Sequence, residues 1–261
     1  MANKFAIVTG ASTGIGFELA SIAAEHGYDL LVVANEPLID AAARDFETHG
    51  VSVQSVEADL SSFEGVDRLL AAANGRPVDL LCANAGHGLG GAFLEQEPHE
   101  WRHVVDTNVT GTVYLLQQVL KQMTARGEGK VLVTGSIAGW VPGSFQAVYN
   151  GTKAFIDNFV AAIQDELKDH KGLVITNLQP GATETEFFDR ADMLDTKVGT
   201  MAKADANKVA RDGWEALMAG KAHVTSGLMN KLQVAAAAVL PQSMMAAAHR
   251  KQAEPGTGEP S

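Results

Sequence analysis

The sequence has little of several residue types that mark whole classes of protein. Its one cysteine, Cys82, cannot form an internal disulfide, and it lies in the apolar stretch VDLLCANAG. This indicates a small buried side chain in a protein of a reducing compartment. Basic residues are also scarce, because 20 lysines and arginines stand against 31 aspartates and glutamates, for a net charge of −11. That balance argues against a nucleic-acid partner or an anionic membrane surface.

Long hydrophobic runs are missing as well. The most apolar late stretch, LQVAAAAVLP, is about half the length needed to span a bilayer and ends at Pro241, so we predict no transmembrane helix. The start passes from MANK directly into FAIVTG, without the succession of basic, apolar and small residues that marks a secretory signal. We therefore expect a cytoplasmic protein. We also predict no metal site.

Apolar residues, at 46% of 261, are enough to fill a sizeable core. Short runs rich in β-branched residues alternate with longer helical patterns, which predicts repeated βαβ units. The runs are almost continuously apolar, so both faces of the sheet must be covered by helices. The fold class that we predict is α/β, a Rossmann-like doubly wound parallel sheet in a single domain. The predicted strands are FAIVTG, DLLVVA, VSVQSVEAD, VDLLCANAG, GKVLVTGS and GLVITNLQPG.

Helical patterns separate these strands, and the chain after the sixth strand is less regular. We predict one domain over 1–251, with a substrate flap at 182–203, a helical extension at 228–251 and a disordered tail at 252–261. The extension could cover the active site, join subunits or lie on a membrane, and its alanine-rich composition favours packing within or between subunits. The predicted helices are 38–48, 62–73, 98–126, 144–169 and 204–219.

The first predicted strand runs directly into TGASTGIG, residues 9–16, and a helix follows. Glycines let the chain turn tightly and let the backbone approach a pyrophosphate, which then faces the positive end of the helix. A dinucleotide is the natural ligand. The loop lacks the Lys-Ser or Lys-Thr pair of a phosphate-binding loop that hydrolyses ATP. The alternative is an ordinary tight turn between strand and helix.

A second glycine-rich stretch, GHGLGG at 86–91, does not open into an amphipathic helix. We interpret it as a loop over the carboxyl end of the fourth strand. His87 in this loop could bind substrate, but a solvated loop histidine is the favoured interpretation.

Four motifs occur in one order: TGASTGIG, NAG at 84–86 and Ser136, each where a predicted strand ends, and then Tyr149 with Lys153 in YNGTK, in the predicted helix 144–169. With these motifs the chain resembles the short-chain dehydrogenase/reductase family over roughly residues 4 to 227. The resemblance implies a catalytic set of Asn108, Ser136, Tyr149 and Lys153.

The spacing of Tyr149 and Lys153 has a chemical meaning, because residues i and i+4 share one face of a helix. A phenol with a pKa near 10 exchanges protons poorly at neutral pH, and lowering that pKa by about three units takes roughly 4 kcal/mol. The attraction of a close ammonium for the phenolate is of the right strength to do this. The small residues Gly151 and Thr152 leave room for a cofactor. Tyr149 then acts as general acid in carbonyl reduction or as general base in alcohol oxidation.

The resemblance also implies roles for the other three residues. Ser136 donates a hydrogen bond to the substrate oxygen, Lys153 also holds the nicotinamide ribose, and Asn108 holds a water that links Lys153 to solvent. The resemblance implies that the cofactor contacts Gly10, Ser12, Thr13, Gly14, Ile15, Gly16, Asn35, Asp59, Leu60, Asn84, Ala85, Gly86, Tyr149, Lys153, Pro180, Gly181, Thr183 and Thr185. Asp59 would accept from the adenine amino group, or it would cap the helix that follows.

The choice between NAD(H) and NADP(H) is where the chain departs from the family pattern. Ala34 stands where NAD users tend to carry an acid, and Asn35 where NADP users tend to carry an arginine; Thr13 is not basic. Glu36 would repel a 2′-phosphate and could accept from a free 2′-hydroxyl. The sequence therefore favours NAD(H).

The expected substrate pocket is apolar. Its predicted residues are Ser136, Val141, Phe145 and Phe187, with Trp140 and Phe188 beside them, which favours an apolar, uncharged carbonyl or secondary alcohol. Alternatively, these aromatic residues only pack the flap onto the body. The resemblance implies a homodimer or homotetramer. Two rival functions are a redox sensor that binds the dinucleotide without hydride transfer, and a sugar-nucleotide epimerase or dehydratase.

Overall fold

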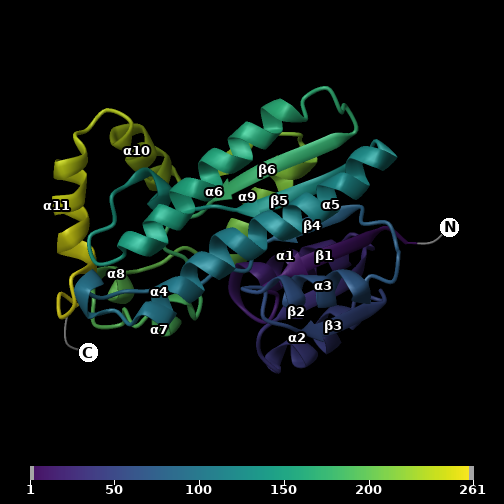
Figure 1. The fold of residues 1–261 in the computed structure, drawn as a ribbon, viewed down its shortest axis with the longest axis horizontal. Coiled ribbons are helices and arrows are strands. Elements are labelled where there is room, and N and C mark those ends of the chain that lie inside the picture. Colours follow the sequence, from purple (N-terminus) through teal and green to yellow (C-terminus); the bar gives the residue numbers. More distant parts are fainter. Residues whose placement is uncertain (1–2, 259–261) are drawn as a thin grey trace.

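A computed structural model describes residues 3–258 of the chain. Seven strands form one parallel sheet in the order β3-β2-β1-β4-β5-β6-β7, so the chain winds outward in both directions from β1 (Figure 1). The predicted doubly wound α/β fold is confirmed. The strands are β1 Phe5–Thr9, β2 Asp29–Ala34, β3 Val53–Glu57, β4 Leu80–Ala83, β5 Gly129–Thr134, β6 Leu173–Gln179 and β7 His223–Thr225.

Six of these strands match the predicted runs, and β7 was not predicted. β7 has three residues, His-Val-Thr, and is too short to show a pattern. The central strands are buried along their whole length, as two covered faces require. Ile7 of β1 pairs with Leu31 of β2 on one side and Leu81 of β4 on the other, and all three are fully buried.

The helices cover the sheet in two layers. α1, α2 and α9 pack on one face, where Leu19, Phe46 and Trp214 join the side chains of alternate strand residues. α3, α5 and α6 pack on the other face, and α5 and α6 cross in front of the sheet in Figure 1. These helices are α1 Gly14–Glu25, α2 Leu38–Glu47, α3 Phe63–Ala72, α5 Thr112–Arg126, α6 Ala147–Glu166 and α9 Ala206–Met218.

The predicted helix over 98–126 is not one regular α-helix. α4, Pro98–Val105, passes into a wider π-helical segment, η2, Asp106–Gly111, before α5 begins. Gly111 lies against the backbone of Leu60, where an added Cβ would overlap the Leu60 carbonyl oxygen. Such wide turns are frequent at functional sites, and this one carries the buried Asn108.

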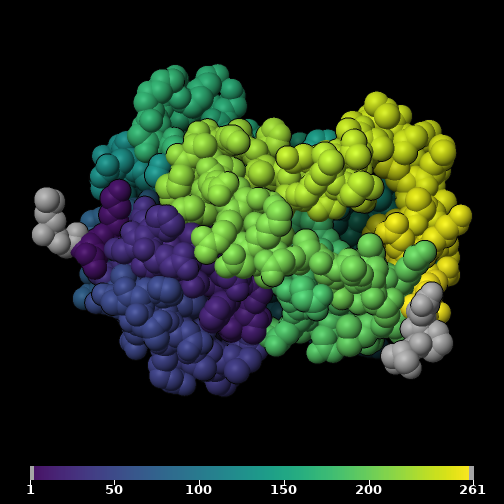
Figure 2. All heavy atoms as spheres, turned by 180° about the vertical axis from the view of Figure 1, so that it is seen from behind, coloured from purple at the N-terminus to yellow at the C-terminus, as the bar shows by residue number. Residues whose placement is uncertain are grey.

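The predicted flap contains two one-turn helices, α7 Phe187–Arg190 and α8 Lys197–Thr200. The predicted extension forms α10, Leu228–Ala237, and α11, Gln242–Ala253, which meet near Pro241. These two helices lie at the end of the molecule away from the N-terminus (Figure 1), and Figure 2 shows the surface hollowed beside them. Within residues 3–258, no helix combines the length and the apolar character that crossing a membrane needs.

The tail does not behave as its composition predicts. Residues 252 and 253 complete α11, and the Gly256 N–H donates to a carboxylate oxygen of Asp195 at 2.8 Å. Gly258 N–H donates to the Asp195 carbonyl at the same distance, so residues 252–258 bind the flap. The prediction of disorder is wrong there, because the glycines form a turn that Asp195 holds, with Gly256 at φ 76°. The rest of that predicted tail, 259–261, and the first two residues of the predicted domain lie outside the described residues.

Candidate active site

A crevice of about 600 Å³ runs along the carboxyl ends of the strands. It passes over the point where the chain reverses direction between β1 and β4, where doubly wound folds bind their ligands. Of the predicted site residues, all line this crevice except Gly16, Asn108 and Phe145. The predicted residues that line it are Gly10, Ser12, Thr13, Gly14, Ile15, Asn35, Asp59, Leu60, Asn84, Ala85, Gly86, Ser136, Val141, Tyr149, Lys153, Pro180, Gly181, Thr183, Thr185 and Phe187.

The glycine-rich loop has the shape that a pyrophosphate needs. Gly10 and Gly14 have φ of 63° and 60°, in the left-handed region that other residues seldom adopt. Gly16 lies behind the loop, where an added Cβ would overlap the Gly10 carbonyl oxygen. The 12-residue helix α1 follows Thr13, whose side chain makes no capping hydrogen bond. The backbone N–H groups at this helix end are therefore available to an anion.

Two residues fasten the loop to the neighbouring strand. The Thr9 hydroxyl accepts from the N–H groups of Asn84 and Ala85, each at 2.9 Å. The Asn84 side chain donates to the Thr9 carbonyl at 3.2 Å and accepts from the Thr134 hydroxyl at 3.0 Å. Sequence reasoning missed Thr9, because its role depends on a strand 75 residues away.

Tyr149 and Lys153 lie one turn apart on α6, as their spacing predicts. Lys153 Nζ is 5.9 Å from the centre of the Tyr149 ring and donates to the Thr134 carbonyl at 2.8 Å. Ser136 ends the loop after β5, and its hydroxyl faces Tyr149 while it accepts from the Ala138 N–H at 3.0 Å. Ser136 and Lys153 are both 6% exposed. The structure thus brings a phenol, an ammonium and a hydroxyl together at one wall of the crevice.

The protein's own groups do not lower the pKa of Tyr149, contrary to the expectation from sequence. Burial raises the pKa of Tyr149 to about 12, although the Ser136 hydroxyl works in the opposite direction. Burial also lowers the pKa of Lys153 to about 8, because an ammonium is costly away from water. Burial is therefore the largest influence on both pKa values.

Asn108 lies behind the crevice and is 2% exposed. Its side chain accepts from the His87 N–H at 2.7 Å and donates to the His87 carbonyl at 2.9 Å. A Cβ added at Gly86 would lie 3.3 Å from Asn108 Oδ1 and 3.5 Å from Lys153 Nζ, so these two atoms approach the same point.

The residues between Tyr149 and Lys153 differ from expectation. Gly151 is exposed, and an added Cβ there would meet nothing within 4 Å, so it makes no room for a cofactor. Thr152 faces inward, and its hydroxyl accepts from the Asn108 side chain at 3.0 Å. The reason is helix geometry, because residue i+2 projects away from the face that i, i+3 and i+4 share.

The flap closes over the crevice at three places. Thr185 packs on Gly14 of the glycine loop, where an added Cβ would lie 2.7 Å from its methyl carbon. Phe187 packs on Gly88, and its ring lies 5.0 Å from that of Tyr149. The third contact is ionic and is made by Arg190.

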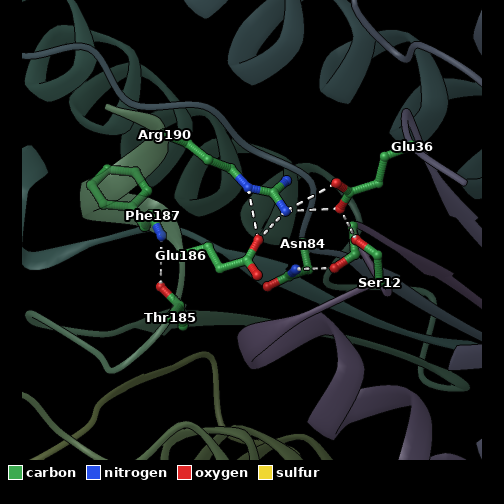
Figure 3. A network of polar contacts seen from close by, with 8 residues as sticks. Ser12, Glu36, Asn84, Thr185, Glu186, Phe187 and Arg190 are labelled. Atoms are coloured by element: carbon green, nitrogen blue, oxygen red, sulfur yellow. Dashed lines mark hydrogen bonds and ion pairs between the residues drawn. The ribbon is translucent and has the colours of Figure 1, made fainter. Parts of the chain in front are cut away.

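Arg190 joins the flap to Glu36, on the side of the crevice that follows β2 (Figure 3). It donates to both carboxylate oxygens of Glu36, at 2.9 and 3.1 Å, and also pairs with Glu186. Glu36 accepts from the Ser12 hydroxyl at 2.5 Å. Burial works against the charge of Glu36, but Ser12 and Arg190 hold the pKa of its carboxyl below the usual value. No local pattern pointed to Arg190, which lies 154 positions from Glu36.

Two predicted pocket aromatics lie elsewhere. Phe145 packs with the flap cluster, with its ring under the Arg250 guanidinium at 5.0 Å. Its φ of 63° turns the chain just before α6 and directs the ring away from the crevice lining. Trp140, in the short helix η3, Ile137–Trp140, is 43% exposed and does not line the crevice either.

Two open interpretations of polar residues are resolved by position. Asp59 does not cap α3, since Ser62 does so by accepting from the Gly65 N–H at 3.1 Å. Asp59 accepts from the Ser61 N–H instead and lines the crevice. His87 is not a solvated loop histidine, because it lines the crevice edge-on to His103 and burial lowers its pKa.

The C-terminal helices form part of the wall. α10 contributes Gln233 to the crevice, and α11 contributes His249 and Gln252. His249 Nδ1 lies 2.9 Å from the Ser144 carbonyl, which ties α11 to the segment before α6. Sequence reasoning left the place of this extension open and named none of these three residues.

Comparison with known proteins gives a consistent result. A family model described as short chain dehydrogenase matches residues 4–194. A curated uncharacterized oxidoreductase of Myxococcus xanthus is 34% identical over 192 residues, which cover 71% of this chain and 74% of that protein.

Two solved structures share the fold. A short-chain dehydrogenase from Sphingobium yanoikuyae in complex with NADPH has a TM-score of 0.80 at 23% identity, over 92% of this chain and 97% of that one. A short chain dehydrogenase/reductase from Burkholderia phymatum in complex with NAD has a TM-score of 0.81 at 22% identity, over 89% and 92%.

Proposed function

Because the chain belongs to the short-chain dehydrogenase family and is an oxidoreductase that uses NAD(P)(H), we propose that Tyr149 carries the proton in its reaction. The reaction interconverts a carbonyl and a secondary alcohol. The observation that supports this most is the position of Ser136, Tyr149 and Lys153 on the same crevice as the glycine loop.

Ser136 and Tyr149 have separate roles in this reaction. A bound dinucleotide supplies or accepts the hydride. Ser136 donates a hydrogen bond to the substrate oxygen and stabilises its developing charge. Tyr149 gives its proton to that oxygen in reduction and removes it in oxidation. Since burial raises the pKa of Tyr149 to about 12, the phenol stays protonated until substrate and cofactor meet it, which suits a general acid.

Lys153 and Asn108 act after Tyr149 has given up its proton. A charged Lys153 beside the ring stabilises the phenolate that proton transfer creates. A water between Lys153 Nζ and Asn108 Oδ1 would return a proton from solvent, and the approach of both atoms to one point beside Gly86 supports this. Asn108 is fixed for that task by its two hydrogen bonds to the His87 backbone.

NAD(H) is the cofactor that the adenosine side favours. Glu36 carries a charge there, and a 2′-phosphate beside it would be repelled, whereas a 2′-hydroxyl could donate to it. Arg190 weakens this preference because it pairs with the same carboxylate. The test is kcat/KM with NADH and with NADPH. A value at least tenfold higher with NADPH would contradict the preference.

The substrate we propose has an apolar group beside its carbonyl. Val141, Phe187 and Phe188 line the crevice, and Phe187 contacts the Tyr149 ring. The C-terminal helices add only polar side chains to the lining, among them Gln233 and Gln252. A polar group elsewhere on the substrate would find partners there.

A homodimer or homotetramer is the assembly we propose. Phe155 on α6 is 46% exposed and stacks on Phe159, and Phe63 on α3 is 52% exposed. Such aromatic side chains commonly become buried between subunits. Light scattering that gives the mass of a single chain would contradict this.

The function is tested with a panel of ketones, aldehydes and alcohols and with NADH or NADPH deuterated at C4 of the nicotinamide. We expect turnover with at least one carbonyl and deuterium on the carbinol carbon of its product. Tight dinucleotide binding with no turnover across the panel would favour the rival function, a redox sensor without hydride transfer.

A further inference from the structure

Asp157 is a carboxyl group that the proposed mechanism does not use, and it lies one helical turn beyond Lys153 on α6. Its carboxyl packs against the loop that carries Ser136. A Cβ at Gly135 would overlap one carboxyl oxygen, and a Cβ at Gly139 would lie 2.7 Å from the other. Only glycine therefore lets the loop come this close to Asp157.

A third element, β6, meets the same carboxyl. The Asn177 side chain donates to Asp157 Oδ1 at 2.8 Å. The second oxygen, Oδ2, is buried and has no hydrogen-bond partner among the residues that the structure describes. A buried carboxylate with one oxygen unpaired is costly unless a charge compensates it. The Asp157 carboxyl on α6 therefore contacts both the Ser136 loop and β6. Its buried negative charge requires a nearby cation.

Lys153 is that cation. Burial lowers the pKa of Lys153 to about 8, and Asp157 acts against that effect. Within residues 3–258, Asp157 is the one charged side chain that influences the pKa of Lys153; the other close groups are neutral, namely Tyr149 on α6 and the Thr134 carbonyl on β5. Burial raises the pKa of Asp157, while Asn177, Lys153, Gln179 and the Ser136 backbone work to lower it.

We propose that Asp157 is a positioning residue of the active site, whose carboxylate keeps the buried Lys153 ammonium charged and holds the loop that presents Ser136. The inference rests on the proposed function, since it assigns the charge of Lys153 to proton transfer. Asp157 touches neither substrate nor cofactor in this role. It acts through two residues that do.

The consequence for pH has a definite sign. A carboxylate beside an ammonium favours the charged form, so losing the carboxylate lowers the pKa of Lys153 further. Lys153 would then lose its charge at a lower pH, and the pH above which reduction slows would fall with it. A residue with only a structural role would reduce stability and leave this pH unchanged.

The test is Asp157→Asn, which keeps the shape of the side chain and removes its charge. The matched control is Asp165→Asn, on the same helix, where Asp165 is 76% exposed and pairs with Lys168. The Lys153 pKa is followed by NMR of protein labelled with 13C at lysine Cε, with Lys153→Met to assign the signal. We expect a decrease of about one unit or more in Asp157→Asn and no change in the control.

The pH profile of kcat for carbonyl reduction gives the second measurement. Its descending limb should move to lower pH by the same amount as the NMR titration. An unchanged Lys153 pKa in folded Asp157→Asn would overturn the inference. The NMR titration needs no turnover, so it still tests Asp157 if the substrate panel shows the proposed function to be wrong.

A second variant covers the case in which Asp157→Asn does not fold. Asn177→Ala keeps the carboxyl but removes the hydrogen bond that Asn177 donates to it, which favours the neutral acid. We expect the Lys153 pKa to move in the same direction by a smaller amount. A Lys153 pKa equal to that of the wild type in Asn177→Ala would contradict the inference.

Discussion

The two ends of the crevice are held together by different forces. At the proposed catalytic end, Lys153 and Asn108 are 6% and 2% exposed and bind backbone carbonyls or N–H groups of neighbouring elements. At the proposed adenosine end, Arg190 and Glu36 bridge the crevice with side chains that are 35% and 23% exposed. The first end is part of the core, and the second is a surface ion pair.

This difference indicates which end of the crevice can move. Buried hydrogen bonds to backbone keep their geometry, and burial is what shifts the pKa values of Tyr149 and Lys153. An exposed ion pair is weak and is screened by salt. We therefore expect the ion pair between Arg190 and Glu36 to break more readily than the buried hydrogen bonds of Lys153 and Asn108.

The largest effect should come from removing charge at the catalytic end. Lys153→Met should lower kcat by at least about 10²-fold, because the phenolate of Tyr149 loses its stabilising cation. The control is Lys168→Met, just past the end of α6, where Lys168 is 62% exposed. It should retain wild-type turnover. Steady-state kinetics with the best carbonyl of the panel measure both, and comparable losses in the two variants would refute the role of Lys153.

The glycine loop gives the next largest effect. Gly16→Ala should weaken dinucleotide binding at least about tenfold, because the added methyl overlaps the Gly10 carbonyl and forces the loop open. Gly151→Ala is the control, since its methyl would meet nothing within 4 Å and alanine favours a helix. Quenching of protein fluorescence by NADH measures both. Equal affinities would show that the loop does not need this close approach.

Burial of Lys153 also predicts how stability depends on pH. The folded pKa of about 8 lies below the ordinary 10.5, so between these values the unfolded chain binds more protons. The free energy of unfolding should therefore rise with pH, by about 2 kcal/mol between pH 8 and 10 from this residue. Urea unfolding of the wild type and of Lys153→Met isolates this difference. Parallel curves for the two proteins would mean that Lys153 is not buried.

The adenosine end gives the smallest effect. Glu36→Gln should cost about 0.2–1 kcal/mol of flap closure, seen as a few-fold faster dissociation of NADH in stopped flow. The change should shrink in high salt, because screening already weakens the pair. Arg190→Gln alone and both changes together complete a cycle that measures the coupling. A coupling energy of several kcal/mol would mean that Arg190 and Glu36 are held as strongly as the buried residues of the catalytic end.

Sequence reasoning reached the parts of the molecule that depend on neighbours in the chain. Six strands, the glycine loop and the Tyr149–Lys153 pair follow from local spacing, and the structure brings the expected residues to one crevice, except Gly16, Asn108 and Phe145. It failed where position depends on tertiary contacts. Arg190 meets Glu36 across 154 positions, and Gln233 and His249 reach the crevice from helices whose composition left their place open.

Other differences have local physical causes that a pattern does not show. The wide turn at Asn108 has no marker in the stretch DTNVTG, since its hydrogen-bond ring differs by one residue from that of an α-helix. Phe145 reads as an ordinary pocket aromatic until its positive φ is seen. The sequence shows that Asp157 lies at i+4 from Lys153, but only the fold shows that its carboxyl is packed against Gly135 and Gly139.

The central claim is that Tyr149 delivers the proton, and one pair of variants tests it most directly. Tyr149→Phe removes a hydroxyl that faces Ser136, whereas Tyr114→Phe removes one that bonds Asp67 away from the crevice. With deuterated cofactor and the best carbonyl, we predict that Tyr149→Phe keeps dinucleotide affinity but loses at least about 10²-fold in kcat, while Tyr114→Phe matches the wild type. A Tyr149→Phe enzyme that retained more than about a tenth of the wild-type rate would contradict the claim.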